Sequence, residues 1–459
     1  MTMRELGKRL YDHLHPSAQE ALLSGYFFVK RRRVRNATFR TYLQDLRRNE
    51  TADGATLRRM QGDRLAVMMN AALETPYYGE LFRRLGIERA DFRNPDCLTR
   101  LPILTKDVVR RDPDAFVNRA ACQGGGTMAY TSGSTGSPLP VTLAPDFESL
   151  EEAFVARQWA WAGLRDDDRR VRLRGDLVVP ATQESPSPWR RNVSDHELRM
   201  SSYHLSRETA RAYVDRINRF RPQALIAYPS SANLLASFVE AFGLECRIPR
   251  IFTSSETLTA AQRETIERHL GGTVFDHYGC TEASVAIQQC ERGTYHVVPE
   301  YGVTEFLPTE GDDSGTTYDV VSTGLLNTAM PLLRYQTGDR VRISSASACA
   351  CGRAFRVIDA ILGRDDDVVV TPRGDHVGRL DHVYKGLLGI VESQIRQESQ
   401  NDLRVLVVPA ESYDEACEAE LVANLRSRVG DMRIVVERVA AIPRGANGKF
   451  RAVVSALQR

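Results

Sequence analysis

The sequence has no strong excess of charge, no long apolar run and no dense cysteine pattern, and each absence excludes a class of protein. Its 61 Lys and Arg face 59 Asp and Glu, so a net charge of +2 gives no global field that calls for nucleic acid or a membrane as partner. No apolar run reaches the length of a membrane span. Its 8 cysteines are mostly isolated and no signal peptide is visible, so we expect a cytoplasmic protein without structural disulfides.

The length and the first part of the chain indicate several domains and a helical beginning. A chain of 459 residues exceeds one ordinary core and is expected to form two or three domains. Residues from Ser17 to Thr75 are expected to be helical, because apolar positions such as Leu57 and Leu65 recur at helical spacing. Within them, Ala21 to Val29 is followed by a basic cluster that begins at Lys30. This segment is either a packed helix with a solvated basic end or a surface helix that rests on an anionic membrane.

A tract of hydroxyls and glycines, Tyr130 to Pro138, lies between two short apolar runs. Strands predicted at 127–131 and 139–143 place its glycines in a sharp turn. There, backbone N–H groups and Ser and Thr hydroxyls can surround an anion, so the tract is a candidate phosphate site. It is not a Walker loop, since no Lys-Ser or Lys-Thr follows the last glycine. The alternative interpretation is an ordinary surface turn or linker.

Beyond an expected irregular polar excursion from Ala181 to Met200, predicted helices and strands alternate between residues 208 and 276. Such alternation indicates parallel α/β layers, in which ligands bind beyond the carboxyl ends of the strands. Two segments follow predicted strands there: Ser254 to Glu256, and His277 to Glu282. The second offers an aromatic face for a base, a hydroxyl for a phosphate and a carboxylate for Mg²⁺. Each residue is also common in packing or on a surface.

The last third of the chain is expected to hold a β region and a second, small unit. Residues 302–343 approach the period of two that strands require, and include Arg334 to Asp339. The Thr-Gly-Asp turn in that segment either presents a carboxylate to paired ribose hydroxyls or is an ordinary turn. After a charged break at Gly363 to Asp367, predicted strands surround a helix near 414–428, which indicates an α+β unit of about a hundred residues. Near its end, Pro443 to Lys449 places a lysine on a glycine-rich turn.

Together these motifs resemble those of the adenylate-forming superfamily of acyl-CoA synthetases, and within it the phenylacetate–CoA ligase branch, most closely its CapK-like or coenzyme F390 synthetase-like members. The resemblance implies an α/β fold with two domains. A large N-terminal domain of α/β layers with a β subdomain would span residues 1–362, and a small, mobile α+β C-terminal domain would span 368–459, joined by a hinge at 363–367. The segments that carry the resemblance are Thr131 to Pro138, Tyr278 to Glu282, Arg334 to Asp339, Gly363 to Asp367 and Pro443 to Lys449.

The resemblance also implies a role for each motif in binding ATP. Tyr278 would stack on adenine and Thr281 would touch the α-phosphate, while Glu282 would bind Mg²⁺. Lys449 would bridge the α-phosphate and the substrate carboxylate, whose mutual repulsion requires a positioned cation. The phosphates would be held by the first loop, that is Thr131, Ser132, Gly133, Ser134, Thr135 and Gly136. Adenine and ribose would be surrounded by Ser255, Glu256, Gly279, Asp339 and Arg364. The small domain would turn about a hinge formed by Arg364 and Asp365.

The activity implied is that of a ligase that makes an acyl-adenylate from a small carboxylic acid and MgATP and then transfers the acyl group, by default to CoA. The segment Val368 to Gly378 departs from the one that lines the pantetheine tunnel in phenylacetate–CoA ligases, so an amine acceptor, giving an amide, stays open. A nucleotide-binding protein without catalysis is the alternative from another class. The chain would be a monomer or a homodimer. Arg174 either pairs with an anionic substrate or caps a strand.

A separate group of residues has the composition of a zinc site. Cys290 and His296 form Cys-x5-His, and Cys349 and Cys351 form Cys-x-Cys. Three thiolates and an imidazole suit closed, tetrahedral zinc, although they could equally be reduced cysteines. The resemblance favours zinc, since relatives in this branch carry it at similar positions; such a zinc would be structural and do no chemistry. For His277 and Cys280, nearer the expected active site, we expect only packing roles.

Overall fold

The structure is a computed structural model that divides into two compact units. The first unit comprises Met1–Val109, Asp114–Thr127 and Leu143–Gly363, and the second Arg110–Pro113, Met128–Thr142 and Arg364–Arg459. The residues that the structure describes are 11, 14–131, 139–176, 178–179, 187–205, 208–309, 316–343, 348–363, 369–373, 376–377, 380–384, 387, 389–409, 412–440, 442 and 453–457.

The segment predicted to be helical, Ser17 to Thr75, is largely helical, and capping residues set where its helices start. Asn36 accepts a hydrogen bond from the Phe39 N–H at 3.1 Å, and Asp53 accepts one from Thr56 at 2.7 Å, so the helical region breaks at both residues. Thr75 caps the next helix, which has proline at its first position. The helices are α2 (Pro16–Val34), α3 (Ala37–Asn49), α4 (Gly54–Leu73), α5 (Pro76–Leu85) and α6 (Lys106–Arg111).

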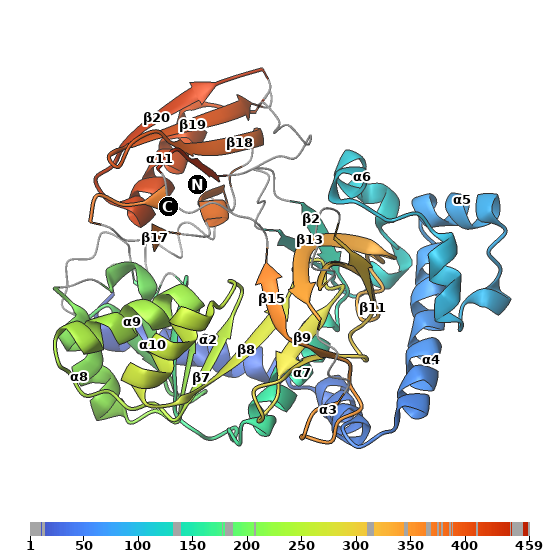
Figure 1. The fold of residues 1–459 in the computed structure, drawn as a ribbon, viewed down its shortest axis with the longest axis horizontal. Coiled ribbons are helices and arrows are strands. Elements are labelled where there is room, and N and C mark those ends of the chain that lie inside the picture. Colours follow the sequence, from blue (N-terminus) through green and yellow to red (C-terminus); the bar gives the residue numbers. More distant parts are fainter. Residues whose placement is uncertain are drawn as a thin grey trace. The chain divides into compact units, whose positions relative to one another are not determined.

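A nine-stranded sheet with helices on both faces forms the centre of the first unit. Its order is β14-β10-β9-β8-β7-β6-β3-β5-β4, and β5, β3, β6, β7 and β8 run parallel. Helices α8, α9 and α10 cover one face, and α2 and α7 cover the other (Figure 1). The strands are β3 (Arg170–Arg174), β4 (Trp189–Asn192), β5 (Glu197–Ser201), β6 (Ala224–Ala227), β7 (Arg250–Ser254), β8 (Thr273–Gly279), β9 (Ala286–Gln289), β10 (Tyr295–Val297) and β14 (Val357–Ile358), and the helices are α7 (Phe147–Trp161), α8 (Ala210–Phe220), α9 (Pro229–Ala241) and α10 (Ala260–Leu270).

The apolar residues of the parallel strands divide between the two faces. Leu225 and Ile251 pack into the core beneath α8 to α10, whereas Ile226 and Phe252 pack with Trp159 of α7. This alternation confirms the predicted α/β layers. The expected irregular excursion from Ala181 to Met200 is wrong in its second half, which forms β4 and β5.

The strand signal of β4 and β5 was hidden because several inward side chains are charged. Arg190 of β4 is only 2% exposed and donates to the side chain of Gln19 in α2. Glu197 of β5 is 3% exposed and accepts hydrogen bonds from Arg172 at 2.8 Å and Arg199 at 2.6 Å. Pairing offsets the cost of burying these groups.

A second sheet of four antiparallel strands completes the first unit and is the predicted β region. Leu104 forms a parallel bridge with Tyr335 of this sheet, and the Leu104 N–H donates to the Arg334 carbonyl at 2.9 Å. This contact fixes the start of the segment Arg334 to Asp339. The strands are β11 (Gly302–Pro308), β12 (Thr317–Gly324), β13 (Tyr335–Arg342) and β15 (Ala360–Gly363).

The second unit is an α+β fold in which β18, β19, β20 and α11 lie where the sequence predicted strands and a helix, whereas β21 was not predicted. Its four-stranded sheet has the order β20-β19-β18-β21, and apolar residues such as Ile395, Val405 and Leu421 form its core. Two hairpins belong wholly or in part to this unit. The elements are β18 (Ile390–Gln397), β19 (Asp402–Pro409), α11 (Glu415–Val429), β20 (Arg433–Arg438) and β21 (Val453–Ser455), with hairpins β1 (Thr127–Tyr130) and β2 (Pro140–Leu143), and β16 (Val369–Val370) and β17 (His376–Val377).

Candidate functional site

The carboxyl end of β8 and the turn after it carry four of the predicted site residues, Tyr278, Gly279, Thr281 and Glu282. Thr281 of this turn is exposed, whereas Glu282 is only 5% exposed. The turn is closed by a hydrogen bond from the Ala283 N–H to the Cys280 carbonyl at 3.1 Å, and Ala283 adopts a positive φ of 56°. Gly302 of β11 lies directly against the turn, and a Cβ there would collide with the Ser284 carbonyl. The second sheet therefore holds this turn in place.

Tyr278 and Asp339, which the resemblance assigns to adenine and ribose, are in direct contact. The Tyr278 hydroxyl donates to the Asp339 carboxylate at 2.7 Å. Burial and the Asp339 charge together raise the pKa of Tyr278 well above its usual value, so it remains a donor. The Asp339 backbone is held by a hydrogen bond to the Thr337 hydroxyl at 3.1 Å, after Gly338 with a φ of 79°. The geometry thus brings together two predicted residues 61 positions apart.

Glu282 is oriented by Tyr335, a residue to which no role could be assigned from the sequence. The Tyr335 hydroxyl, on a ring that is fully buried, donates to Oε1 of Glu282 at 2.8 Å. Tyr335 belongs to the segment Arg334 to Asp339, but nothing in its spacing indicates this contact. The hydrogen bond fixes one carboxylate oxygen, and a carboxylate offers further acceptor positions for a hard cation.

Ser255 and Glu256 lie at the same edge of the sheet as Tyr278, because Ser254 of β7 is in register with His277 of β8. Ser255 adopts a positive φ of 70°, and its hydroxyl accepts a hydrogen bond from Arg174 at 2.7 Å. The Glu256 carboxylate accepts from the N–H and the hydroxyl of Ser230, both at 3.0 Å. Glu256 therefore binds the first turn of α9, where the helix dipole favours a negative charge.

His277 and Cys280 have the packing roles expected of them. Burial and nearby Arg174 lower the pKa of His277 to about 4, so its imidazole is neutral at physiological pH. The Gln288 side chain contacts its Nδ1 at 3.3 Å. Burial raises the pKa of the Cys280 thiol to about 12, and its sulfur lies 3.3 Å from the Ser284 hydroxyl. A thiol so far from ionisation is a poor nucleophile.

Only the first residue of the predicted phosphate loop lies within the described residues. Thr131 is 4% exposed; its N–H donates to the Leu139 carbonyl at 3.0 Å, and its hydroxyl accepts from the Leu139 N–H at 2.9 Å. These bonds close the base of the loop between the two predicted strands. The other predicted residues of the loop, hinge and small domain lie outside the described residues, and their roles stay predictions: Ser132, Gly133, Ser134, Thr135, Gly136, Arg364, Asp365 and Lys449.

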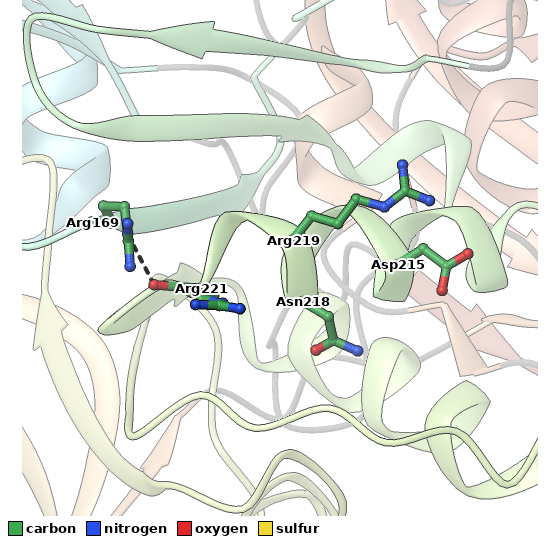
Figure 2. A pocket seen from close by; sticks show the side chains of 5 residues that line it. All are labelled: Arg169, Asp215, Asn218, Arg219 and Arg221. Carbon is green, nitrogen blue, oxygen red and sulfur yellow. Dashed lines mark hydrogen bonds between the residues drawn. The ribbon is translucent and has the colours of Figure 1, made fainter.

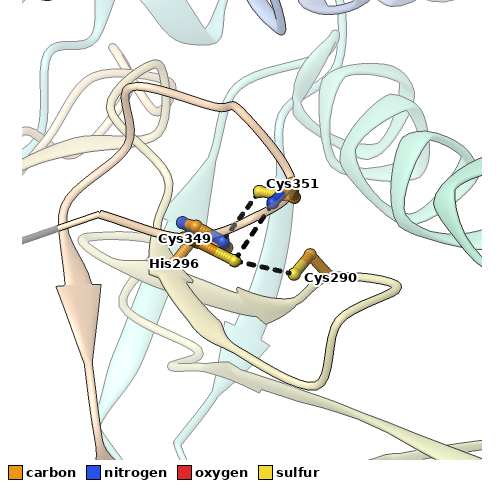
Figure 3. Close-up of side chains that lie close together, drawn as sticks. All are labelled: Cys290, His296, Cys349 and Cys351. Carbon is orange, nitrogen blue, oxygen red and sulfur yellow. Dashed lines mark hydrogen bonds between the residues drawn. The ribbon is translucent and has the colours of Figure 1, made fainter. Parts of the chain in front are cut away.

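The four predicted zinc ligands, Cys290, His296, Cys349 and Cys351, come together (Figure 3). Their ligand atoms all lie within 4.8 Å of one another; the sulfurs of Cys290 and Cys349 are 3.8 Å apart, and that of Cys351 is 3.3 Å from His296 Nε2. Donors bound tetrahedrally at about 2.0–2.3 Å stand about 3.3–3.8 Å apart. The His296 Nδ1 faces the Phe355 carbonyl at 3.4 Å, which leaves Nε2 for a metal. The cluster therefore fits zinc.

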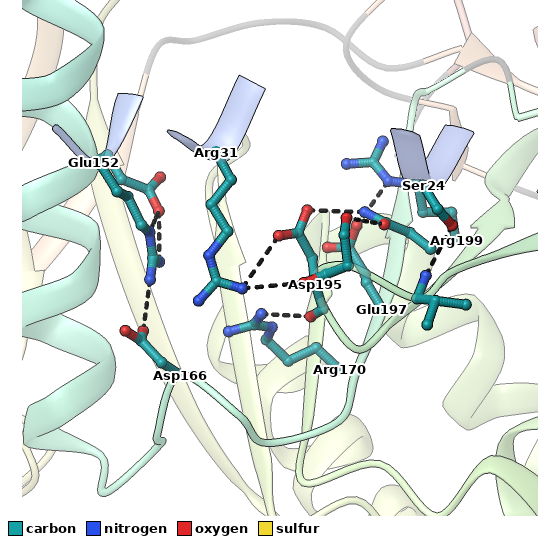
Figure 4. A network of polar contacts seen from close by, with 12 residues as sticks. Ser24, Arg31, Glu152, Asp166, Arg170, Asp195, Glu197 and Arg199 are labelled. Carbon is teal, nitrogen blue, oxygen red and sulfur yellow. Dashed lines mark hydrogen bonds and ion pairs between the residues drawn. The ribbon is translucent and has the colours of Figure 1, made fainter. Parts of the chain in front are cut away.

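The basic cluster after Val29 is paired with acidic residues of the first unit. Lys30 and Arg33 both contact Glu148 of α7, at 2.7 and 2.6 Å. Arg31 contacts Asp195 at 3.4 Å (Figure 4). These ion pairs lie at the surface, where the side chains of Lys30 and Arg33 stay 37% and 67% exposed, as expected for a packed helix with a solvated basic end. No helix in the described ranges has the length and hydropathy needed to cross a bilayer.

Two surface cavities lie at the amino edge of the parallel sheet, opposite the carboxyl edge that carries Tyr278, Ser255 and Glu282. The first, of about 560 Å³, is lined by Arg169, Asp215, Asn218, Arg219 and Arg221 (Figure 2). Arg169 directly precedes β3, so this cavity lies at the amino end of that strand; the second cavity shares Asn218 with it. Because ligands of parallel sheets bind at the carboxyl edge, we assign neither cavity to the nucleotide.

Comparisons with known proteins agree with the motifs and the fold. The model of the CapK C-terminal domain matches residues 369–456. The chain is similar to Protein CapK of Staphylococcus aureus, at 23% identity over 97% of this chain and 98% of CapK. It is also similar to a phenylacetate-coenzyme A ligase of Thermus thermophilus, at 25% identity over 88% of this chain and 98% of the ligase.

A solved structure of 2-hydroxyisobutyryl-CoA ligase, in complex with 2-HIB-AMP and CoA, superposes with a TM-score of 0.58. The identity is 21%, with 89% of this chain and 91% of that chain covered, so this likeness concerns the fold. It confirms the predicted fold class. In sequence, in its C-terminal domain and in fold, the chain is thus similar to adenylate-forming, phenylacetate–CoA ligase-like proteins.

Proposed function

We propose that the protein is an ATP-dependent acid ligase that forms an acyl-adenylate and transfers the acyl group to CoA. The observation that carries the proposal is the pairing of Tyr278 with Asp339, beside Glu282, at the carboxyl edge of the parallel sheet. This is the edge at which such folds bind nucleotides. The relatives named phenylacetate-coenzyme A ligase, and the neighbour solved with an acid–AMP adduct and CoA, support the same reaction.

In the first step, an oxygen of the acid attacks the α-phosphorus of ATP, and the bond to the pyrophosphate oxygen breaks. Tyr278 would stack on adenine while holding Asp339 toward the ribose hydroxyls, so the α-phosphate lies near exposed Thr281. Glu282, oriented by Tyr335, has the carboxylate chemistry to hold Mg²⁺, which when bound offsets the negative charge of the phosphates. Lys449 would supply the cation that the approaching carboxylate requires.

In the second step, the thiolate of CoA attacks the acyl carbon, and AMP leaves with the oxygen that the acid contributed. The alternative acceptor, an amine, would give an amide by the same bond changes. We propose CoA because the relatives with named activities are CoA ligases. Turnover with CoA and no turnover with amines would support this choice.

We also propose that Cys290, His296, Cys349 and Cys351 hold a structural zinc ion. Their donor set is closed, with four protein ligands, so the metal would have no position for a substrate. The ligands come from the turn after β9, from β10 and from the loop before β14. Zinc would therefore fix the residues that lead from the second sheet back to the edge of the first. A cytoplasmic location and a monomeric or homodimeric state remain predictions.

Exchange of labelled pyrophosphate into ATP tests the first step. We expect the purified protein to catalyse exchange when a suitable acid is present, and Lys449→Ala to lose exchange while still binding ATP. Lys30→Ala, which removes a surface lysine paired with Glu148, is the matched control and should retain exchange. Full exchange by Lys449→Ala would refute the role of this lysine, and absence of exchange across a broad acid panel would refute the proposed reaction.

A further inference from the structure

Arg174 occupies a position where four strands of the parallel sheet end. It is the last residue of β3, and its guanidinium lies 5.0 Å from the ring centre of Tyr228, which directly follows β6. The same guanidinium donates to the Ser255 hydroxyl after β7 at 2.7 Å. Its backbone carbonyl accepts a hydrogen bond from Ser202 at 2.9 Å. The side chain thus reaches across β6 to β7, one strand from the turn that carries Thr281.

The sheet topology makes this position a binding edge. From β3 the chain passes to β5 on one side, and then returns to β6 on the other side of β3. Connections therefore reverse direction between β3 and β6, and in parallel α/β sheets ligands bind outside the carboxyl ends at such a switch point. Arg174 and Tyr228 stand on the two sides of it.

The carboxylates near Arg174 have partners of their own. Glu197 pairs with Arg172 and Arg199, and Asp176 pairs with Arg199 at 3.3 Å. Glu256 binds Ser230 at the start of α9. Among the described residues, no carboxylate forms an ion pair with Arg174.

The surroundings of Arg174 disfavour its charge. Burial lowers the pKa of this arginine, and the like charge of Arg172, two residues earlier on the same face of β3, lowers it further; Tyr228 and Asp176 raise it only in part. His277 adds no compensating charge, because it is neutral. A negative group bound at Arg174 would therefore meet a partly desolvated cation that has no ion-pair partner among the described residues.

We infer that Arg174 determines specificity by holding a second carboxylate of the acid, so that the substrates are short dicarboxylic acids. This inference rests on the proposed function. The planar guanidinium, stacked on Tyr228, presents its edge to a ligand and matches a carboxylate with parallel hydrogen bonds. Arg174 reaches to within about one strand spacing, ~5 Å, of β8, where the other carboxylate meets the α-phosphate, so a short linker joins the two groups.

Paired acids of equal chain length test the inference: succinate against butyrate, glutarate against valerate, and adipate against hexanoate. In pyrophosphate exchange, the intact protein should prefer one dicarboxylate over its partner by about 10- to 100-fold in kcat/KM, the effect of one charged hydrogen-bonding contact. Arg174→Met should remove that preference by raising KM for the dicarboxylate, and should change exchange with the monocarboxylate far less. Arg174→Lys, which keeps the charge, should restore part of it.

Arg169→Met is the matched control, since Arg169 precedes the other end of β3 and should not affect the preference. Thermal unfolding of each variant shows whether it is folded. Equal use of both members of every pair by the intact protein, or an Arg174→Met variant that slows both members equally, would overturn the inference while the proposed function stands. Absence of exchange with every acid would instead contradict the proposed function itself.

Discussion

Replacing Asp339 by asparagine should weaken ATP binding with little effect on folding. The substitution keeps the size of the side chain and one acceptor oxygen, so the Tyr278 hydroxyl retains a partner in place of the 2.7 Å bond to the carboxylate. The backbone bond from Asp339 to the Thr337 hydroxyl is unaffected. What is lost is the negative charge and the second acceptor that would face the ribose hydroxyls.

The size of the effect follows from the kind of hydrogen bond that is lost. A hydrogen bond to a charged group contributes about 1.5–3 kcal/mol, and each 1.4 kcal/mol is about tenfold in affinity. Asp339 is partly exposed, which favours the lower end, so we expect ATP affinity to fall by about 10- to 30-fold. Stability should change by only about 1 kcal/mol, since a neutral hydrogen bond replaces a charged one.

Calorimetric titration with a non-hydrolysable ATP analogue measures this loss directly. Asp319→Asn is the matched control, because Asp319 lies on the neighbouring strand β12 and pairs with Arg340 at 3.3 Å. It should bind the analogue like the unaltered protein. Unchanged affinity in Asp339→Asn, or an equal loss in both variants, would refute the assignment of Asp339 to the ribose.

Three further predictions concern the metal, the buried ion pair and pH. Cys351→Ser should lower both the zinc content, measured by mass spectrometry, and the melting temperature. Cys122→Ser, outside the cluster, should change neither quantity. A native protein that is stable and contains no zinc would contradict the metal site. Glu300→Leu leaves the fully buried Arg157, 2.7 Å away, without its carboxylate partner. It should lower the free energy of unfolding, measured by chemical denaturation, by about 3–5 kcal/mol, and adding Arg157→Met should recover much of that loss. Burial raises the pKa of Glu151 from 4.5 to about 7, so its stabilising protonated form is lost as pH rises toward 7. As the pH rises from 5 to 8, the free energy of unfolding should therefore fall less for Glu151→Gln than for the native protein. Identical profiles of stability against pH for the two proteins would contradict this.

The sequence was most informative where secondary structure follows from apolar periodicity. The strands at Ile226 and Phe252, and the helix between them, could be predicted because short apolar runs alternate there with a longer helical segment, and their apolar residues do divide between the two faces of the sheet. The strands β4 and β5 were missed because Arg190 and Glu197 point inward and are stabilised by partners distant in sequence. A search for apolar periodicity does not detect a strand whose buried face carries charged side chains.

The candidate site shows the same division between local motif and distant contact. The motifs identified Tyr278 and Asp339 separately, but their hydrogen bond depends on how two different sheets pack. The contact of Tyr335 with Glu282 and the reach of Arg174 to Ser255 likewise depend on tertiary structure. The zinc ligands could be proposed from residue type alone, although their proximity follows from the pairing of β10 with β14.

The claim that the acid is activated as an adenylate is tested most directly by following its oxygen. Acid labelled with ¹⁸O in its carboxylate, incubated with the enzyme, MgATP and CoA, should transfer one labelled oxygen to the phosphate of AMP, as measured by mass spectrometry. Label in inorganic phosphate, or unlabelled AMP formed together with acyl-CoA, would contradict the account.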